Sequence, residues 1–167
     1  GYLAEARQLT LDRTGAKEAL QRALQLDPMY EYAAATLFDW QFEDKEWDAC
    51  DTTIAHLKEY VSGDVTHLRE LKLALRREDF QVARQRLQEL ATSTTEDRSL
   101  LDEAVAAAKD TPQAARWQTE IDSVLDYVVE TQSPNANAVA VWVERNAKAE
   151  NYAKVQGWLE LLPDREE

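Results

Sequence analysis

The chain has 167 residues and a formal net charge of −13, with a sequence isoelectric point of about 4.6. A surface this acidic repels the phosphate backbone at long range, which argues against nucleic acid as a main ligand. The length suits a single domain with a sizeable core. Four glycines, four prolines and many Ala, Leu, Glu and Gln residues favour an all-α fold, because strands would need more β-branched runs and turn glycines.

The single cysteine, Cys50, permits no internal disulfide and is compatible with a reducing compartment, so we favour a cytoplasmic location. No apolar run approaches the length of a membrane span, and we expect no membrane insertion. The chain opens at Gly1 without a signal peptide and already inside an expected helix. We therefore interpret it as a fragment of a longer protein.

The first expected hairpin pairs a helix over residues 2–12 with a helix over residues 14–26. The second of these carries Ala16, Leu20, Ala23 and Leu24 at helical spacing. Asp27-Pro28 ends it, because proline lacks the backbone donor and disfavours a helical residue before it.

Four more hairpins follow in chain order. The expected helices are 31–43 with 46–61, 64–77 with 79–91, 96–109 with 112–131, and 134–149 with 151–162. Ser62-Gly63 ends the second hairpin, where glycine can take the left-handed cap conformation. Thr111-Pro112 and Ser133-Pro134 each place a capping residue before a proline, which is typical of a helix start. Trp117, Trp142 and Trp158 share stripes with apolar residues, so we expect them to pack in the core.

The hairpins repeat at a fixed interval. A step of 34 residues takes Ala16, Leu20 and Ala23 to Cys50, Ile54 and Leu57, and the same step takes Leu3 to Leu37 and Leu71. A third copy, with Phe80, Ala83, Leu87 and Leu90, follows the second by 33 residues. Self-similarity at this period indicates stacked helical hairpins.

Residues 1–92 resemble a tetratricopeptide repeat array, on the residues just named, and residues 93–167 keep only the alternation of helices. The resemblance implies one domain, an α-α superhelix that is a right-handed solenoid of about five antiparallel hairpins. It also implies a non-enzymatic role in binding a protein or peptide partner in a concave groove.

The register of the family places a groove on the first helices of the second and third hairpins. The candidate partner-binding residues are Tyr32, Asp39, Phe42, Arg69, Leu73, Arg76 and Arg77, beside Ala35 and Thr36. They form an aromatic and acidic wall next to a basic one, which suits a peptide of mixed charge. The alternative is that Phe42 and Trp40 belong to the core and that the arginines form a solvated face.

Catalytic and metal-binding readings find little support in the sequence. Asp48, Cys50, Asp51 and His56 lie close together but point in different directions around one helix, and Cys50 takes the small-residue position of the repeat. No glycine-flanked serine and no glycine-rich phosphate loop is present, so we expect no enzyme activity and no cofactor. Two alternatives stay open: a regulatory or substrate-positioning domain of a larger enzyme such as a glycosyltransferase, and self-assembly through exposed repeat ends.

Overall fold

A computed structural model describes residues 12–61, 63–94, 97–109, 111–131 and 134–160. These residues are helical and contain no strand, which confirms the all-α class. The helix expected over residues 2–12 lies outside the described residues, apart from its last position. The described helices are α2 (Arg13–Leu26), α3 (Glu31–Glu43), α4 (Trp47–His56) with a π-helical turn η1 (Leu57–Val61), α5 (Gly63–Arg76), α6 (Phe80–Thr92), α7 (Arg98–Ala106), α8 (Ala114–Thr131), α9 (Ala136–Lys148) and α10 (Tyr152–Glu160).

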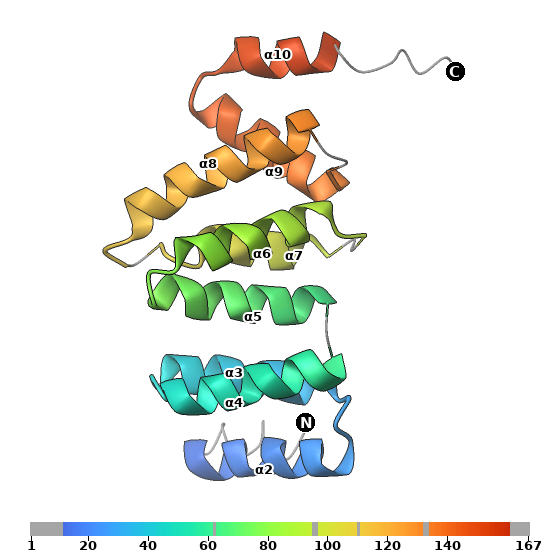
Figure 1. Cartoon of the computed structure of the whole chain (residues 1–167), viewed down its shortest axis with the longest axis vertical. Helices are drawn as coiled ribbons and strands as arrows, with labels where there is room; N and C mark the ends of the chain where they lie inside the picture. Colours follow the sequence, from blue (N-terminus) through green and yellow to red (C-terminus); the bar gives the residue numbers. More distant parts are fainter. Residues whose placement is uncertain (1–11, 62, 95–96, 110, 132–133, 161–167) are drawn as a thin grey trace.

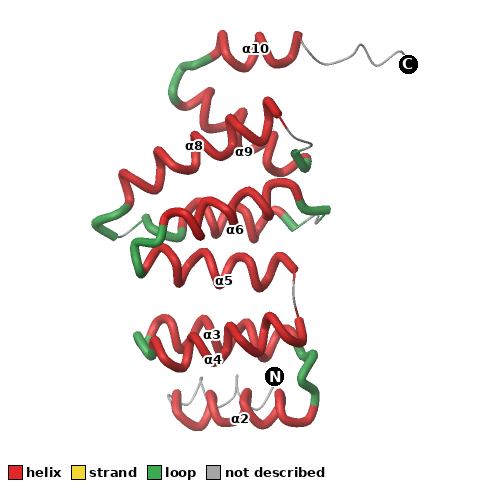
Figure 2. The backbone as a smooth tube through the Cα atoms, viewed as in Figure 1, coloured by secondary structure: helices red, strands yellow, loops and turns green. Residues whose placement is uncertain are grey.

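The helices stack in chain order as a column, with α2 at one end and α10 at the other (Figures 1 and 2). Helix α3 packs on α5, α5 on α7, and α7 on α9, so these odd-numbered helices make one continuous layer. The even-numbered helices pack against the odd ones, as α2 and α4 do on α3, and α6 does on α5. Residues about thirty positions apart in the sequence thus become neighbours on the odd-numbered layer. A right-handed superhelix stays a prediction.

In three of the hairpins, the two helices are connected by the same type of turn. Lys45, Glu78 and Glu150 have positive φ angles of 61°, 60° and 58°, in the left-handed region that few non-glycine residues adopt. In each case the next residue's N–H donates to the carbonyl five positions back, which closes the end of the odd helix. These bonds, each 2.9 Å long, join Glu46 to Gln41, Asp79 to Ala74, and Asn151 to Asn146.

Buried apolar side chains form three clusters along the stack. One joins α2 to α3 around Leu20 and Leu37. The second joins α3, α4, η1 and one residue of α5, Leu73. The third and largest runs from α5 to α9 and contains Trp117 and Trp142, with Trp158 packed against it, as the sequence predicted. Leu73 is therefore the one described α5 side chain that joins the core of α3 and α4.

When η1 is counted with α4, expected and observed helix ends differ by at most three residues within the described part of the chain. Gly63 has a φ angle of 73°, which confirms the left-handed conformation expected there. Helix α9 begins later than expected, because Asn135 caps it: its side chain accepts from the Ala138 N–H at 2.8 Å and donates to the Leu90 carbonyl at 2.8 Å. The π-helical turn that ends α4 was not expected.

The buried leucines Leu20 on α2 and Leu87 on α6 test the packing, since both are 0% exposed. Leu20→Ala and Leu87→Ala should each lower the free energy of unfolding by about 2 to 5 kcal/mol, because each leaves a cavity. Leu26→Ala is the matched control, since Leu26 is 88% exposed, and should change it by less than about 0.5 kcal/mol. Urea denaturation followed by circular dichroism measures all three. Losses below about 0.5 kcal/mol at both buried positions would contradict the packing.

Candidate functional site

The centre of the predicted groove is occupied by ion pairs between α3 and α5. The Arg69 guanidinium donates to Asp39 Oδ2 at 2.6 Å, and the Lys72 ammonium donates to Asp39 Oδ1 at 3.1 Å. Arg69 is only 7% exposed and also donates to the Val65 carbonyl of its own helix. The acidic and basic walls that the sequence predicted do lie side by side, and they neutralise each other.

The ion pairs continue along the odd-numbered layer. Lys72 also pairs with Glu103 of α7, and Arg98 of α7 makes two hydrogen bonds of 2.8 Å to the carboxylate of Glu144 on α9. One face of α3, α5, α7 and α9 is therefore crossed by ion pairs between successive odd-numbered helices. Such pairs fix how neighbouring hairpins lie against each other.

Leu73 does not lie on the surface of this face. Its side chain is 5% exposed and packs with Phe38 and Ile54 in the second core cluster. The expectation that Leu73 faces a groove is corrected here: α5 is covered by α3 and α4 on one side and by α6 and α7 on others, so most of its side chains are buried. Tyr32, at the start of α3, is 44% exposed and its ring lies 6.1 Å from that of Tyr30.

An exposed arginine lies on an aromatic stack at the end of α3 and α5. The Arg76 guanidinium carbon lies 5.0 Å from the centre of the Trp47 ring. The Trp47 ring meets Phe42 edge-on at 5.5 Å, and Phe42 in turn stacks on the buried Phe38 at 5.8 Å. Phe42 and Trp47 are each half-buried, so this stack connects an exposed cation to the core. The repeat register predicts Phe42 and Arg76 in one groove but not Trp47, because Trp47 begins α4 and not an odd-numbered helix.

Arg77 points to a different neighbour, Asp51 of α4, with an N–O distance of 2.6 Å. The hydrogen bond from Arg77 holds the pKa of Asp51 below its usual value. The Arg77 side chain is thus directed toward α4 and not into the predicted groove. Among the seven predicted residues, Asp39 and Arg69 contact each other, and Phe42 and Arg76 both contact the Trp47 ring. Leu73 is buried, Arg77 pairs with Asp51, and Tyr32 lies beside Tyr30.

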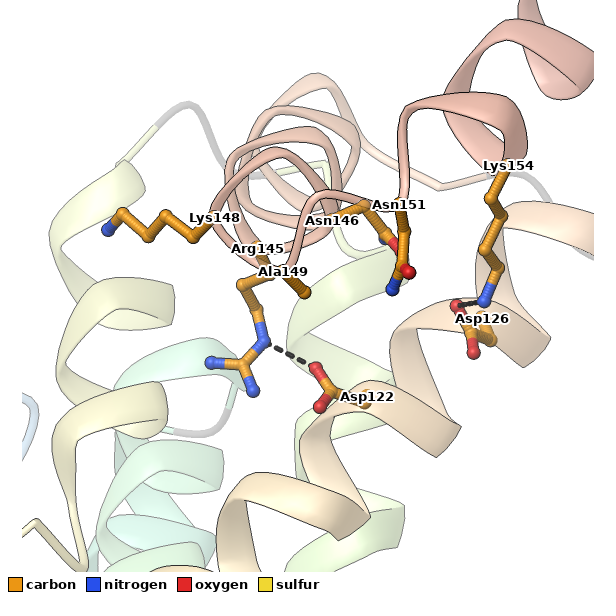
Figure 3. Close-up of a pocket in the computed structure, with 8 residues that line it drawn as sticks. All are labelled: Asp122, Asp126, Arg145, Asn146, Lys148, Ala149, Asn151 and Lys154. Atoms are coloured by element: carbon orange, nitrogen blue, oxygen red, sulfur yellow. Dashed lines mark hydrogen bonds and ion pairs between the residues drawn. The ribbon is translucent and has the colours of Figure 1, made fainter.

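A polar pocket of about 380 Å³ lies between α8, α9 and the start of α10 (Figure 3). Arg145 points to Asp122 with an N–O distance of 2.6 Å, and Lys154 points to Asp126 at 2.5 Å. Asp126 also accepts a hydrogen bond of 2.7 Å from the indole of the buried Trp142. Each carboxylate that lines the pocket is therefore already paired with a cation, while Lys148 points away from both pairs (Figure 3).

Cys50 is a buried side chain in the second core cluster. Burial raises the pKa of its thiol to about 11, and the nearby carboxylates of Asp51 and Glu46 act in the same direction. The thiolate needed for nucleophilic or metal chemistry is therefore disfavoured. Within the described residues, no three potential metal ligands come together, and no helix is both long and apolar enough to cross a membrane.

Comparisons with protein-family models, with curated proteins and with solved structures found no match to this chain.

The Arg77–Asp51 pair gives a pH-dependent prediction. Arg77→Ala removes the donor that lowers the pKa of Asp51, so that pKa should rise to its ordinary value of about 4. Because the folded-state pKa is the lower one, the pair stabilises the fold above the unfolded pKa and loses this effect as pH falls through the folded one. Both side chains are half exposed, so the effect at neutral pH should stay below about 1 kcal/mol. Carboxyl-carbon NMR titration measures the pKa; an unchanged value beside an Arg22→Ala control would contradict the pairing.

Proposed function

We propose that the chain is a non-enzymatic protein-interaction module, built from tetratricopeptide-like hairpins, that binds a protein or peptide segment on its odd-numbered layer. The repeat in the sequence and the repeated turn after α3, α5 and α9 support this reading. A layer of successive helices offers an extended surface to which several hairpins contribute. The observation that carries the proposal is Arg76, an exposed cation held against the Trp47 ring.

The position of Arg76 suits recognition of a carboxylate. Arg76 has no ion-pair partner among the described residues, unlike Arg69 of α5 and Arg77, which directly follows α5. Stacking on Trp47 restricts the guanidinium while leaving its N–H groups free to donate to a planar carboxylate. Phe42 and Trp47 add apolar surface beside it. A partner side chain with an acidic group next to an apolar one would meet both features.

The charge of the whole chain limits what the rest of the partner can be. A net charge of −13 repels a uniformly acidic segment. The partner is therefore a segment of mixed charge, with a carboxylate at Arg76 and neutral or basic residues elsewhere. Asp39, Arg69 and Lys72 lie on the same face but pair with one another, so their main role is to join α3 to α5. The revised binding set is Phe42, Trp47 and Arg76, while Tyr32 lies at the other end of α3 beside Tyr30.

An affinity capture from the native lysate with matched variants tests this proposal. Arg76→Glu and Phe42→Ala should each reduce capture of a partner by about tenfold or more, since one reverses the charge and the other removes the apolar support. Arg22→Glu is the matched control, because Arg22 is another exposed arginine without an ion pair among the described residues. Circular dichroism checks that each variant is folded. Equal capture by wild type and by folded Arg76→Glu would contradict the proposal.

A further inference from the structure

A second hollow lies on the other side of the stack, between α2 and α4. It has a volume of about 430 Å³. Its α4 wall is one helical stripe, made of Ala49, Thr52, Thr53 and His56. The neighbouring stripe of α4, with Cys50 and Ile54, enters the core, and the buried Thr53 lies at the border of the two stripes. Within the described residues, α4 therefore lines this hollow with a stripe of small and polar residues that lies beside its core stripe.

The α2 wall and the floor complete this groove. Gln21, Leu24 and Gln25 line it from α2, and Leu37 and Gln41 of α3 form the floor. Helices α2 and α4 do not pack closely on each other, whereas their counterparts α6 and α8 further along the stack do. The groove is thus the space between α2 and α4. In the other half of the molecule, α6 and α8 pack directly on each other, and this packing fills the equivalent space.

The described residues that line this groove include no Asp, Glu, Lys or Arg, in a chain in which 31% of residues are charged. The charged residues of the same helices, such as Glu18, Arg22 and Asp51, lie outside the lining. A charged group brought into the groove would lose water without meeting an opposite charge, which is costly. An uncharged occupant avoids that cost.

The floor carries a polar group with unused hydrogen-bonding capacity. Gln41 is 3% exposed, and its side-chain oxygen accepts a hydrogen bond of 2.7 Å from the Thr53 hydroxyl. Within the described residues, its amide nitrogen donates to no acceptor. An amide has two N–H donors, and among the described residues Gln41 Nε2 is not one of the buried side-chain atoms without a partner, so these donors are open to water from the groove. A carbonyl oxygen from an occupant would satisfy one of them.

Exposed apolar side chains stand at one end of the groove. His56 Nε2 lies 2.8 Å from the carbonyl oxygen of Pro28, which fixes the loop after α2 against the end of α4. In or next to that loop, Leu26 and Met29 are 88% and 71% exposed. The apolar surface inside the groove, from Leu24 and Leu37, thus has exposed apolar neighbours outside it.

We propose that this groove binds an uncharged segment of a partner protein. The segment places one apolar side chain against Leu24 and Leu37 and offers a carbonyl group to the Gln41 amide. Because the described lining contains no Lys, Arg, Asp or Glu, the groove selects against segments that would place one of these residues inside it. This site is separate from the Arg76 face, which prefers a carboxylate, so the two surfaces recognise different chemistry.

Fluorescently labelled peptides of about twelve residues test the groove. Three sets share a central Leu or Phe, flanked by Gln and Thr in the first set, by Lys in the second and by Glu in the third. Fluorescence polarisation should show binding of the uncharged set, and Ala49→Trp, which fills the groove, should weaken it by about tenfold or more. Ala55→Trp is the matched control, because Ala55 is exposed on α4 and does not line the groove.

A second variant that fills the groove keeps the test valid if the first one does not fold. Thr52→Trp should block the groove as Ala49→Trp does, with Thr119→Trp on α8 as its exposed control. Arg76→Glu should leave binding of the uncharged set unchanged, which separates this inference from the function proposed above. Binding of none of the three sets, equal binding of all three, or unchanged binding in folded Ala49→Trp and Thr52→Trp would each overturn the proposal.

Discussion

Asp39 receives hydrogen bonds from two cations of the next odd-numbered helix, Arg69 at 2.6 Å and Lys72 at 3.1 Å. This contact joins the interior of α3 to the interior of α5, and the two helices pack on each other. Among the described residues, Leu73 is the one α5 side chain in the buried core cluster of α3 and α4. The joint between the first helices and the rest of the stack therefore depends on ion pairs as much as on apolar burial.

Other charged groups at this joint follow the same principle. Glu70 of α5 is 8% exposed and lies between two cations, with N–O distances of 2.5 Å to Lys58 and 2.8 Å to Arg86. Lys58 belongs to η1, so this carboxylate also bridges the two parts of the stack. Removing one partner of such a pair leaves the other charge buried without compensation, which is more costly than the net gain from the intact pair. These buried ion pairs therefore fix how α5 lies against α3 and η1, and replacing a single partner should lower the stability of this contact.

This arrangement also explains why two surfaces differ in chemistry. On the odd-numbered layer, charged side chains form ion pairs between successive hairpins. Arg76 forms no such pair among the described residues, because it lies against the Trp47 ring and not beside a carboxylate. On the α2–α4 side, α4 makes its ion pairs from another stripe, as in Asp51 with Arg77, and the stripe of Thr52 and Thr53 has none. Within the described residues, the first surface offers the unpaired guanidinium of Arg76, and the lining of the second contains no Lys, Arg, Asp or Glu.

The helices could be predicted from the sequence because apolar spacing and stop signals such as Asp27-Pro28 are local. The proximity of Asp39 and Arg69 could also be predicted, since the repeat places both on one face. Their pairing, and the burial of Leu73, could not, because these depend on how far α5 rotates against α3. The turns at Lys45, Glu78 and Glu150 gave no signal either, because glycine is the usual residue in that conformation. The α2–α4 groove depends on the separation of two helices, which no local pattern encodes.

The most direct test of the joint is site-resolved amide hydrogen exchange on the wild type and on Asp39→Ala. We predict that Asp39→Ala lowers the free energy of opening for amides in helices α2, α3 and α4 more than for amides in helices α6, α7 and α8. The difference between the two groups should be about 1 to 3 kcal/mol, because buried Arg69 loses its partner. Asp51→Ala removes an exposed pair of the same 2.6 Å length and should change that difference by less than about 1 kcal/mol. Equal losses in both regions, or no greater effect from Asp39→Ala than from Asp51→Ala, would contradict the central place of this contact.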